Sequence, residues 1–216
     1  HPMTDTSITV HLVKPVVEKG DAFIVECMIE STIQGEWIEL LNATGRSIDV
    51  SQLNVWDGST NTTKALVPGL GWDGVLQPGQ RSVVANQWAP WMAESSPLFA
   101  AIHPSMTLSN TGETVALLSA DGDAIDQVKF SNDWWLSQET IVLQKVHLTG
   151  CTLRHNWKVL GAESEASPGM PSPLEWPTDT AIELVAESAI ALSSGNGMFE
   201  LNQPLHPDCA PVIKGG

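Results

Sequence analysis

Residues 36–42 read Glu-Trp-Ile-Glu-Leu-Leu-Asn and lead into Ala43-Thr44-Gly45. A short apolar run that ends in asparagine, threonine and glycine indicates a strand closed by a tight turn. The same pattern recurs along the chain, and it predicts further strands at residues 7–12, 22–29, 48–56, 81–85, 114–118, 124–130 and 139–148. Many short strands at regular spacing, each followed by turn residues, favour an antiparallel β-sandwich or barrel.

Two connections carry specific turn chemistry. Pro78-Gly79 places proline and glycine at the central positions of a type II turn. Residues 119–123, Ser-Ala-Asp-Gly-Asp, are typical of a hairpin between two strands. Neighbouring strands are therefore expected to pair antiparallel.

In their order, these segments resemble the lamin tail domain, an immunoglobulin-like β-sandwich of nuclear lamins and of many bacterial and archaeal exported proteins. The resemblance spans residues 36–171. It is carried by Glu36–Asn42 with Gly45, Ile48–Val50 and Leu53, by Asp57-Gly58 and Leu76–Gly79, by Leu108–Val115, Leu117-Leu118, Asp121-Gly122 and Ile125-Asp126, and by Trp157 with Ser167–Gly169. It implies an all-β, Ig-like antiparallel β-sandwich that acts as a non-catalytic binding or scaffold module.

The regions outside this resemblance divide the chain into three parts. Residues 1–35 are interpreted as an N-terminal strand extension, whose His1-Pro2 start is either a tag remnant or a processed end. Residues 36–171 form the sandwich, and residues 172–216 form a C-terminal extension. A capping-box sequence at 180–183 predicts a short helix up to Leu192, with two short strands as the competing interpretation.

The charge balance limits the classes of partner. The chain has 216 residues, with 10 Lys and Arg against 25 Asp and Glu, a formal net charge of −15. Such a field repels nucleic acid, and no apolar run reaches the roughly 18 residues needed to span a bilayer. We therefore expect protein partners, no nucleic acid and no membrane insertion. The acidic composition and low lysine count fit an extracellular, cell-surface or periplasmic protein, while a cytoplasmic location stays open.

No cofactor is expected from the sequence. Asp121, Asp123 and Asp126 collect carboxylates at a hairpin, the oxygen ligands that calcium takes, but without EF-hand spacing, and solvated turn residues are the plainer interpretation. Cys151 and Cys209 could form one disulfide, or the cysteines could be free and buried. The histidines lie outside any GxSxG context, so we expect no catalytic residues.

Two features are candidates for binding. Ile8, Val10 and Leu12 share one face of a predicted strand near the chain end, which could pair with the sheet edge of another copy and build an oligomer or filament. The second feature is a set of tryptophans. Trp88 and Trp91 lie in an insertion at residues 88–106. Trp134 is followed by Trp135 in an extended segment, where neighbouring side chains face opposite ways, so at least one of that pair should be near the surface.

These features give three hypotheses. The first is a structural or binding module that assembles through the N-terminal strand. The second is a monomeric adhesion module that binds carbohydrate or protein through the tryptophans, for which packing of the insertion onto the sandwich is the plainer alternative. The third is an enzyme, which would need a histidine and a carboxylate in contact within a polar pocket.

Overall fold

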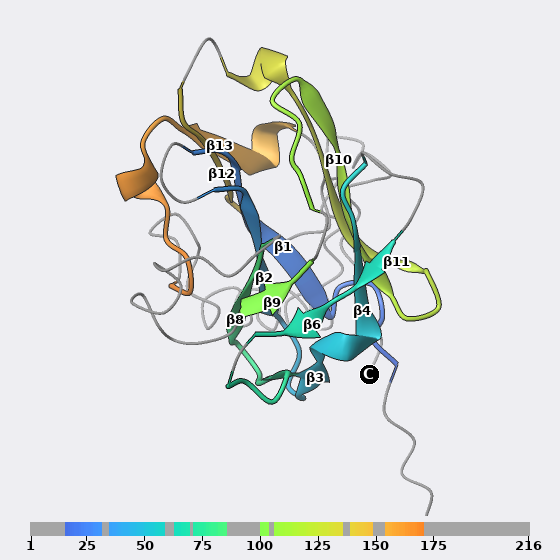
Figure 1. Cartoon of the computed structure of the whole chain (residues 1–216). Coiled ribbons are helices and arrows are strands. Elements are labelled where there is room, and N and C mark those ends of the chain that lie inside the picture. The colour runs from blue at the N-terminus through green and yellow to red at the C-terminus, as the bar shows by residue number, and fades with distance from the viewer. Residues whose placement is uncertain are drawn as a thin grey trace, which may run out of the picture.

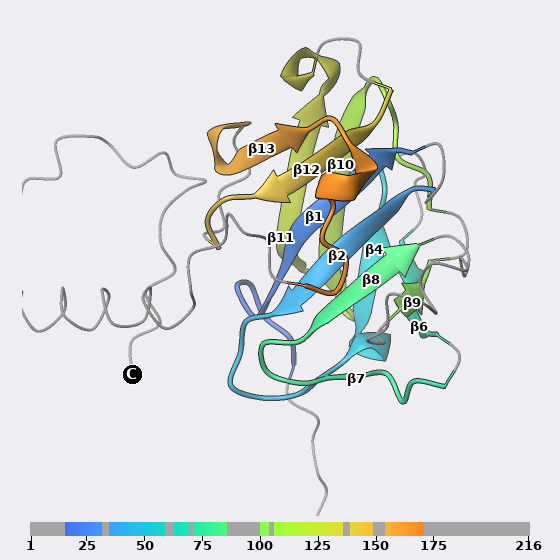
Figure 2. The same cartoon turned by 90° about the vertical axis from the view of Figure 1, so that its left-hand side faces the viewer.

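The computed structural model describes residues 16–31, 35–58, 63–69, 71–85, 100–103, 106–135, 139–148 and 154–170. These residues form two facing sheets, seen edge-on in Figure 1 and with the larger sheet in front in Figure 2. The larger sheet has seven strands in the order β13-β12-β1-β2-β8-β9-β6. Their bounds are β13 (Trp157–Leu160), β12 (Ile141–Lys145), β1 (Ala22–Glu30), β2 (Trp37–Asn42), β8 (Arg81–Ala85), β9 (Ala100–Ile102) and β6 (Val67–Pro68).

The smaller sheet has four strands in the order β11-β10-β4-β5. They are β11 (Ala124–Ser131), β10 (Gly112–Ser119), β4 (Leu53–Trp56) and β5 (Lys64–Ala65). A third pair joins β3 (Ile48–Asp49) to β7 (Val75–Leu76), and the described helical turns are the 3-10 segments η1 (Val50–Gln52), η2 (Asn132–Trp134), η3 (Arg154–Asn156) and η4 (Glu163–Glu165). The two-layer, mainly antiparallel arrangement is the predicted Ig-like β-sandwich.

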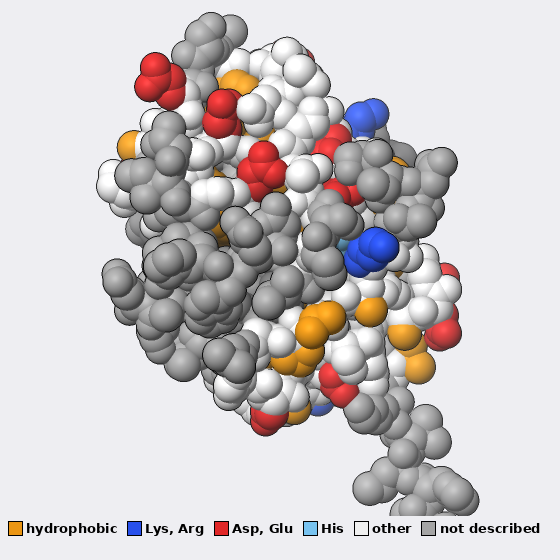
Figure 3. Space-filling model, in the orientation of Figure 1, with side chains coloured by type: hydrophobic (Ala, Val, Ile, Leu, Met, Phe, Trp, Pro, Cys, Tyr) orange, Lys and Arg blue, Asp and Glu red, His pale blue; other side chains and the backbone are white. Residues whose placement is uncertain are grey.

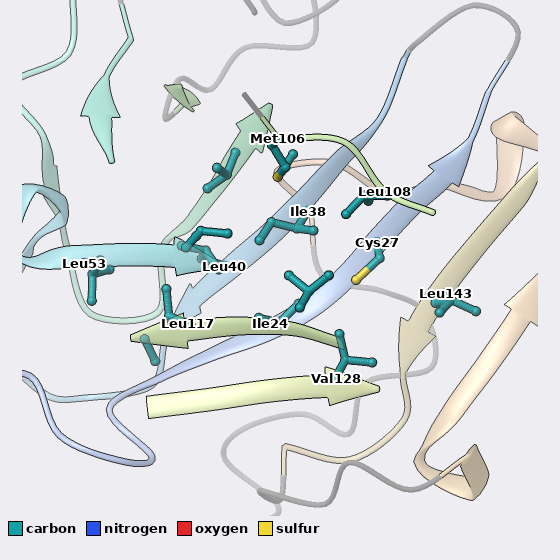
Figure 4. Close-up of a cluster of buried hydrophobic side chains, with 14 of the residues drawn as sticks. Ile24, Cys27, Ile38, Leu40, Leu53, Met106, Leu108, Leu117, Val128 and Leu143 are labelled. Carbon is teal, nitrogen blue, oxygen red and sulfur yellow. The ribbon is translucent and has the colours of Figure 1, made fainter. Parts of the chain in front are cut away.

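Side chains from both sheets fill the space between them, as Figure 4 shows for part of this core. Ile38 and Leu40 from β2 face Leu117 and Val128 of the smaller sheet. All four side chains are fully buried and belong to one cluster. Alternation along each strand explains why these residues point inward. Because about 25 cal/mol is gained per Å² of apolar surface removed from water, this layer supplies most of the drive to fold.

An irregularity in β1 sets which of its residues face this core. The pairing register of β1 with β2 shifts between Ile24 and Glu26, so strict alternation is broken. Ile24 and Cys27 consequently both belong to the inner cluster, although they are three positions apart. Val25 belongs to an outer cluster, and Glu26 joins a polar network on the same outer side.

The predicted boundary of the sandwich at residue 36 is wrong for the N-terminal part. The strand β1 pairs with β2 on one side and with β12 on the other, so it lies in the interior of the larger sheet. Its residues from Ala22 to Ile29 are all buried. A strand that hydrogen-bonds on both edges is part of the sandwich and not an extension from it.

Most other predicted strands are confirmed. The segment 81–85 matches β8, 124–130 matches β11 within one residue, and the last predicted strand is the shorter β12. The Pro78-Gly79 turn is also confirmed: Gly79 takes a φ of +73°, and the Gln80 N–H donates to the Gln77 carbonyl at 3.0 Å.

Several predictions lie outside the described residues. They are the strand at 7–12 with Ile8, Val10 and Leu12, the helix near 182–192, the disulfide between Cys151 and Cys209, and most of the insertion with Trp88 and Trp91.

Candidate functional site

The free edges of the two sheets are the first candidate sites for binding a protein chain. Among the described strands, the larger sheet ends at β13 and β6, and the smaller sheet ends at β11 and β5. β6 and β5 have two residues each, and Pro68 in β6 lacks a backbone donor. β11 is eight residues long, and its Gln127 and Lys129 side chains are exposed. It is therefore the edge best suited to receive an added strand.

Exposed apolar surface is a second indicator of a binding site. The large apolar side chains exposed in the described part are Val16, Val67 and Met170, at 57%, 51% and 58%. In the view of Figure 3, hydrophobic side chains gather around β6, the strand that carries Val67. Asp and Glu side chains on the same face are scattered over the surface.

The structure separates the two tryptophans of the predicted binding surface. Trp135 is 6% exposed and packs in the core against Phe130, with ring centroids 5.9 Å apart, so it is not a surface residue. Trp134 is partly buried, and the Arg154 guanidinium lies 5.4 Å from its ring centroid. This matches the expectation that one of the pair stays near the surface. Trp56 is only half-buried, because Leu53 and Val55 occupy the inward positions of β4.

The three aspartates considered for calcium do not form one site. Asp121 and Asp123 are exposed at the hairpin tip, whose shape is set by Gly122 with a φ of +91° and by a 2.8 Å hydrogen bond from the Ser119 N–H to the Asp123 carbonyl. Asp126 is buried and faces Lys145 instead. Within the described ranges, no group of three His, Cys, Asp or Glu side chains is placed to hold a metal ion.

Lys145 and Asp126 form an ion pair inside the sandwich. The Nζ–Oδ2 distance is 2.8 Å, and the same oxygen accepts the Ile24 N–H at 2.8 Å. The ammonium also lies 4.8 Å from the Phe23 ring centroid and 5.5 Å from that of Trp157. The pair joins β11 to β12 and satisfies a backbone donor of β1 beside its irregular register, which makes it a structural element of the fold.

A group of carboxylates at one end of the sandwich holds the segment that enters β10. Asp57, Glu36 and Glu113 accept the successive N–H groups of residues 107, 108 and 109, at 3.2, 2.7 and 2.8 Å. Burial raises the pKa of Glu113 to about 7, although its hydrogen bond from Ser109 opposes the shift. Burial also raises the pKa of Glu36. These carboxylates hold the backbone of residues 107–109 in place, and this structural role accounts for their position.

A second polar network lies on the outer face of the larger sheet, the face turned away from the smaller sheet. Glu39 pairs with Arg81, with Oε2 2.7 Å from Nη1, and its other oxygen accepts the Gly169 N–H. Glu26 accepts the Ser167 N–H at 3.0 Å and the Ser167 hydroxyl at 2.8 Å. The segment Ser167–Gly169 is thus fastened to the sheet by two buried carboxylates.

Sequence reasoning missed this network. Glu39 shares the outer face of the larger sheet with Trp37 and contacts Arg81 there. Its contact with Gly169 spans 130 positions, and local patterns carry no signal at such separations. A glutamate in the middle of an otherwise apolar strand is the one hint that the sequence offered.

His103 is a buried histidine whose ring is held by a backbone carbonyl. Its side chain is 1% exposed, and its Nε2 lies 3.1 Å from the Val55 carbonyl oxygen. The ring is therefore anchored to the backbone of β4. This is the arrangement of a structural histidine.

Comparison with known proteins agrees with the architecture. The sequence profile of the lamin tail domain matches residues 15–132, which begins earlier than the predicted span and includes β1. No curated protein matches the chain. The structure adds β12, β13 and the Ser167–Gly169 contacts beyond the matched residues, and β12 completes the pairing of β1. No helix in the described part is both long and apolar enough to cross a bilayer. The chain belongs to the lamin tail domain family, whose members are Ig-like, non-enzymatic modules.

Proposed function

We propose that this chain is a binding module of an exported or cell-surface protein, and that it associates with protein chains, copies of itself included, by strand addition. The observation that carries the proposal is the eight-residue edge strand β11, the longest of the described edges. Its backbone N–H and C=O groups on the side away from β10 can pair with an extended segment.

The N-terminal segment supplies a candidate donor of six residues for the eight residues of β11. Residues 7–12 alternate apolar and polar, and an added strand of this pattern would place Ile8, Val10 and Leu12 on one face. On β11 the alternate positions Val128 and Phe130 face the core, so an added apolar row would extend the inner layer. Lys129 between them is exposed and would tolerate acidic partners better than basic ones.

The experiment is light scattering on the full chain and on a chain that lacks residues 1–14. An assembly that falls to a monomer on deletion supports association through the N-terminal strand. A monomer in both cases contradicts it. A chain that starts at residue 15 keeps every strand that the structure describes.

A second candidate function is binding of carbohydrate or protein through tryptophans. Trp134 is the observation that favours it, because its ring is partly exposed and has Arg154 beside it. Aromatic rings with a polar neighbour are common at contact surfaces. Titration with a panel of glycans, followed by tryptophan fluorescence in the native chain and in Trp134→Leu, tests it. No response across the panel, or an equal response in both proteins, argues against this site.

A further inference from the structure

The outer face of the larger sheet carries an apolar cluster under a short segment that is attached mainly by polar contacts. We call residues 163–170 the strap. The cluster consists of Met28, Trp37, Val83, Ala85, Val142 and Leu160, each at most 8% exposed. Ala166 of the strap packs against it. Figure 2 shows the strap, in orange, crossing in front of β12, β1 and β2.

The strap is held by hydrogen bonds to two glutamates and one glutamine. Ser167 donates through its N–H and hydroxyl to Glu26, and Gly169 donates its N–H to Glu39. Gln144 donates from Nε2 to the Glu165 carbonyl at 3.1 Å and to Glu26 at 3.3 Å. Ser164, Glu165 and Met170 of the strap are exposed, so its attachment depends on few contacts.

The charges under the strap do not balance. Within the part of the chain that the structure describes, two carboxylates, Glu26 and Glu39, face one guanidinium, Arg81. With both carboxyls ionised, closing the strap would bury one net negative charge, which is costly in a low-dielectric environment. A proton retained on the pair removes that charge.

The other charged groups that the structure describes on neighbouring elements do not change this balance. Lys158 on β13 lies across from Gln144, but it is exposed. Glu165 on the strap is exposed as well. Lys145 faces the inner side, where it is paired with Asp126, and Cys27 belongs to the inner core.

We propose that residues 163–170 act as a proton-dependent strap, in which Glu26 and Glu39 share a proton while the strap is closed and release it as the strap lifts from the apolar face. Closure is then favoured by neutral and acidic conditions, and opening is favoured by alkaline conditions. The mechanism is a local, sub-global opening, and the rest of the sandwich stays folded.

The direction follows from the two states of the carboxyls. Burial under the strap raises the pKa of Glu26, and it raises the pKa of Glu39 to about 8 against the opposing effect of Arg81. In the open state both carboxyls are solvated and return towards the ordinary value of 4.5. The closed state therefore binds more protons, so its advantage is lost as pH rises through the closed-state pKa.

The test is amide hydrogen exchange by millisecond quench-flow between pH 7.0 and 9.5. Rates are expressed as protection factors, so that the intrinsic effect of pH cancels. For one released proton, the protection of the Ser167 and Gly169 amides should fall by up to about tenfold per pH unit above the closed-state pKa. Amides in β1 and β2 should keep their protection. Constant strap protection, or a parallel loss in β1 and β2, overturns the proposal.

Two variants distinguish protonation of the carboxyls under the strap from an effect of overall charge. Glu26→Gln keeps an oxygen acceptor for Ser167 and leaves Glu39 balanced by Arg81, so the strap should stay protected up to pH 9.5. Glu165→Gln removes the same charge from an exposed side chain and should behave like the unmodified protein. If Glu26→Gln loses protection in step with the unmodified protein, or if Glu165→Gln abolishes the pH dependence, the proposal is wrong.

A measurement on the unmodified protein avoids reliance on any variant. The side-chain carboxyl ¹³C shifts of Glu26 and Glu39 report their protonation directly. Titration of Glu39 with a pKa of about 8, and of Glu26 with a pKa above the ordinary value of 4.5, is expected. Titration of both carboxyls near 4.5, the value of a solvated glutamate, would show that the closed strap retains no proton.

Discussion

The Lys145 ammonium on β12 lies 2.8 Å from the Asp126 carboxylate on β11, and both side chains are buried between the two sheets. The same carboxylate oxygen accepts the Ile24 N–H. One ion pair therefore links β12 of the larger sheet and β11 of the smaller sheet to the irregular part of β1. The arrangement ties together strands that lie 102 positions apart in the sequence.

Removing the lysine should be costly. Lys145→Met leaves the Asp126 carboxylate buried without its counter-charge, which lowers the free energy of unfolding by about 3–5 kcal/mol. The double variant Lys145→Met/Asp126→Asn should recover much of that loss, because the amide oxygen of Asn can still accept the Ile24 N–H. Urea denaturation of the single and double variants measures both effects. Equal stability of Lys145→Met and the unmodified protein would show that the pair contributes little.

Two glycines with positive φ should respond differently to alanine. A Cβ at Gly112 would lie 2.6 Å from the Ser131 Cα and 2.7 Å from the Phe130 carbonyl oxygen, whereas a Cβ at Gly122 meets nothing within 4 Å. Gly122→Ala should cost about 1–2 kcal/mol for backbone conformation alone. Gly112→Ala adds a clash with backbone, for a total of about 2–5 kcal/mol. Thermal unfolding of both variants compares them, and an equal loss contradicts the packing argument.

A buried apolar position gives a simple test of the core. Leu117→Ala removes atoms between the sheets and should lower the free energy of unfolding by about 2–5 kcal/mol. Leu148→Ala is the matched control, because this side chain is only partly buried beside a smaller outer cluster. Denaturant unfolding of both variants should rank Leu117→Ala as clearly less stable, and the reverse order would place the core elsewhere.

The stability of the sandwich should decrease as pH rises from about 5 to about 8.5. Folding raises the pKa of Glu39 to about 8 and that of Glu113 to about 7, and the pKa values of Glu26 and Glu36 also rise. Because the pKa of each of these carboxyls is higher in the folded state than in the unfolded state, folding takes up protons in this window. The free energy of unfolding then falls with increasing pH.

Denaturation series at several pH values check this dependence. Glu113→Gln keeps an oxygen acceptor for the Ser109 N–H and removes one of the titrating groups, so its pH profile should be flatter between pH 5 and 8. Stability that is constant or increases over the range in the unmodified protein would be inconsistent with the raised pKa values.

The sequence predicted the strands with clear alternation and the turns with specific chemistry. The strand at 81–85 and the turn at Pro78-Gly79 follow from short-range rules, since strand period and positive φ depend on neighbouring residues. The position of β1 inside the larger sheet did not follow, because its partner β12 is more than 110 residues away. Pairing between distant strands is set by packing, which local patterns do not encode.

The same reason explains what was missed at the candidate sites. Glu26 and Ser167 are 141 positions apart, and only the folded chain brings them together. Asp126 looked like part of an acidic turn because it follows Asp121 and Asp123, yet strand alternation turns it towards Lys145. For Trp134 and Trp135, alternation indicated that the two rings face opposite ways, but the sequence did not say which ring is buried. In the structure Trp135 is buried and Trp134 is partly exposed.

The most direct test of the proposed function compares two faces of the N-terminal segment by light scattering at equal protein concentration. Ile8→Asp/Val10→Asp/Leu12→Asp charges the apolar face, and Ser7→Asp/Thr9→Asp/His11→Asp charges the polar face of the same segment. Association through strand addition predicts that the first variant is monomeric and that the second assembles like the unmodified chain. An unmodified chain that is monomeric, or two variants with the same mass, would contradict it.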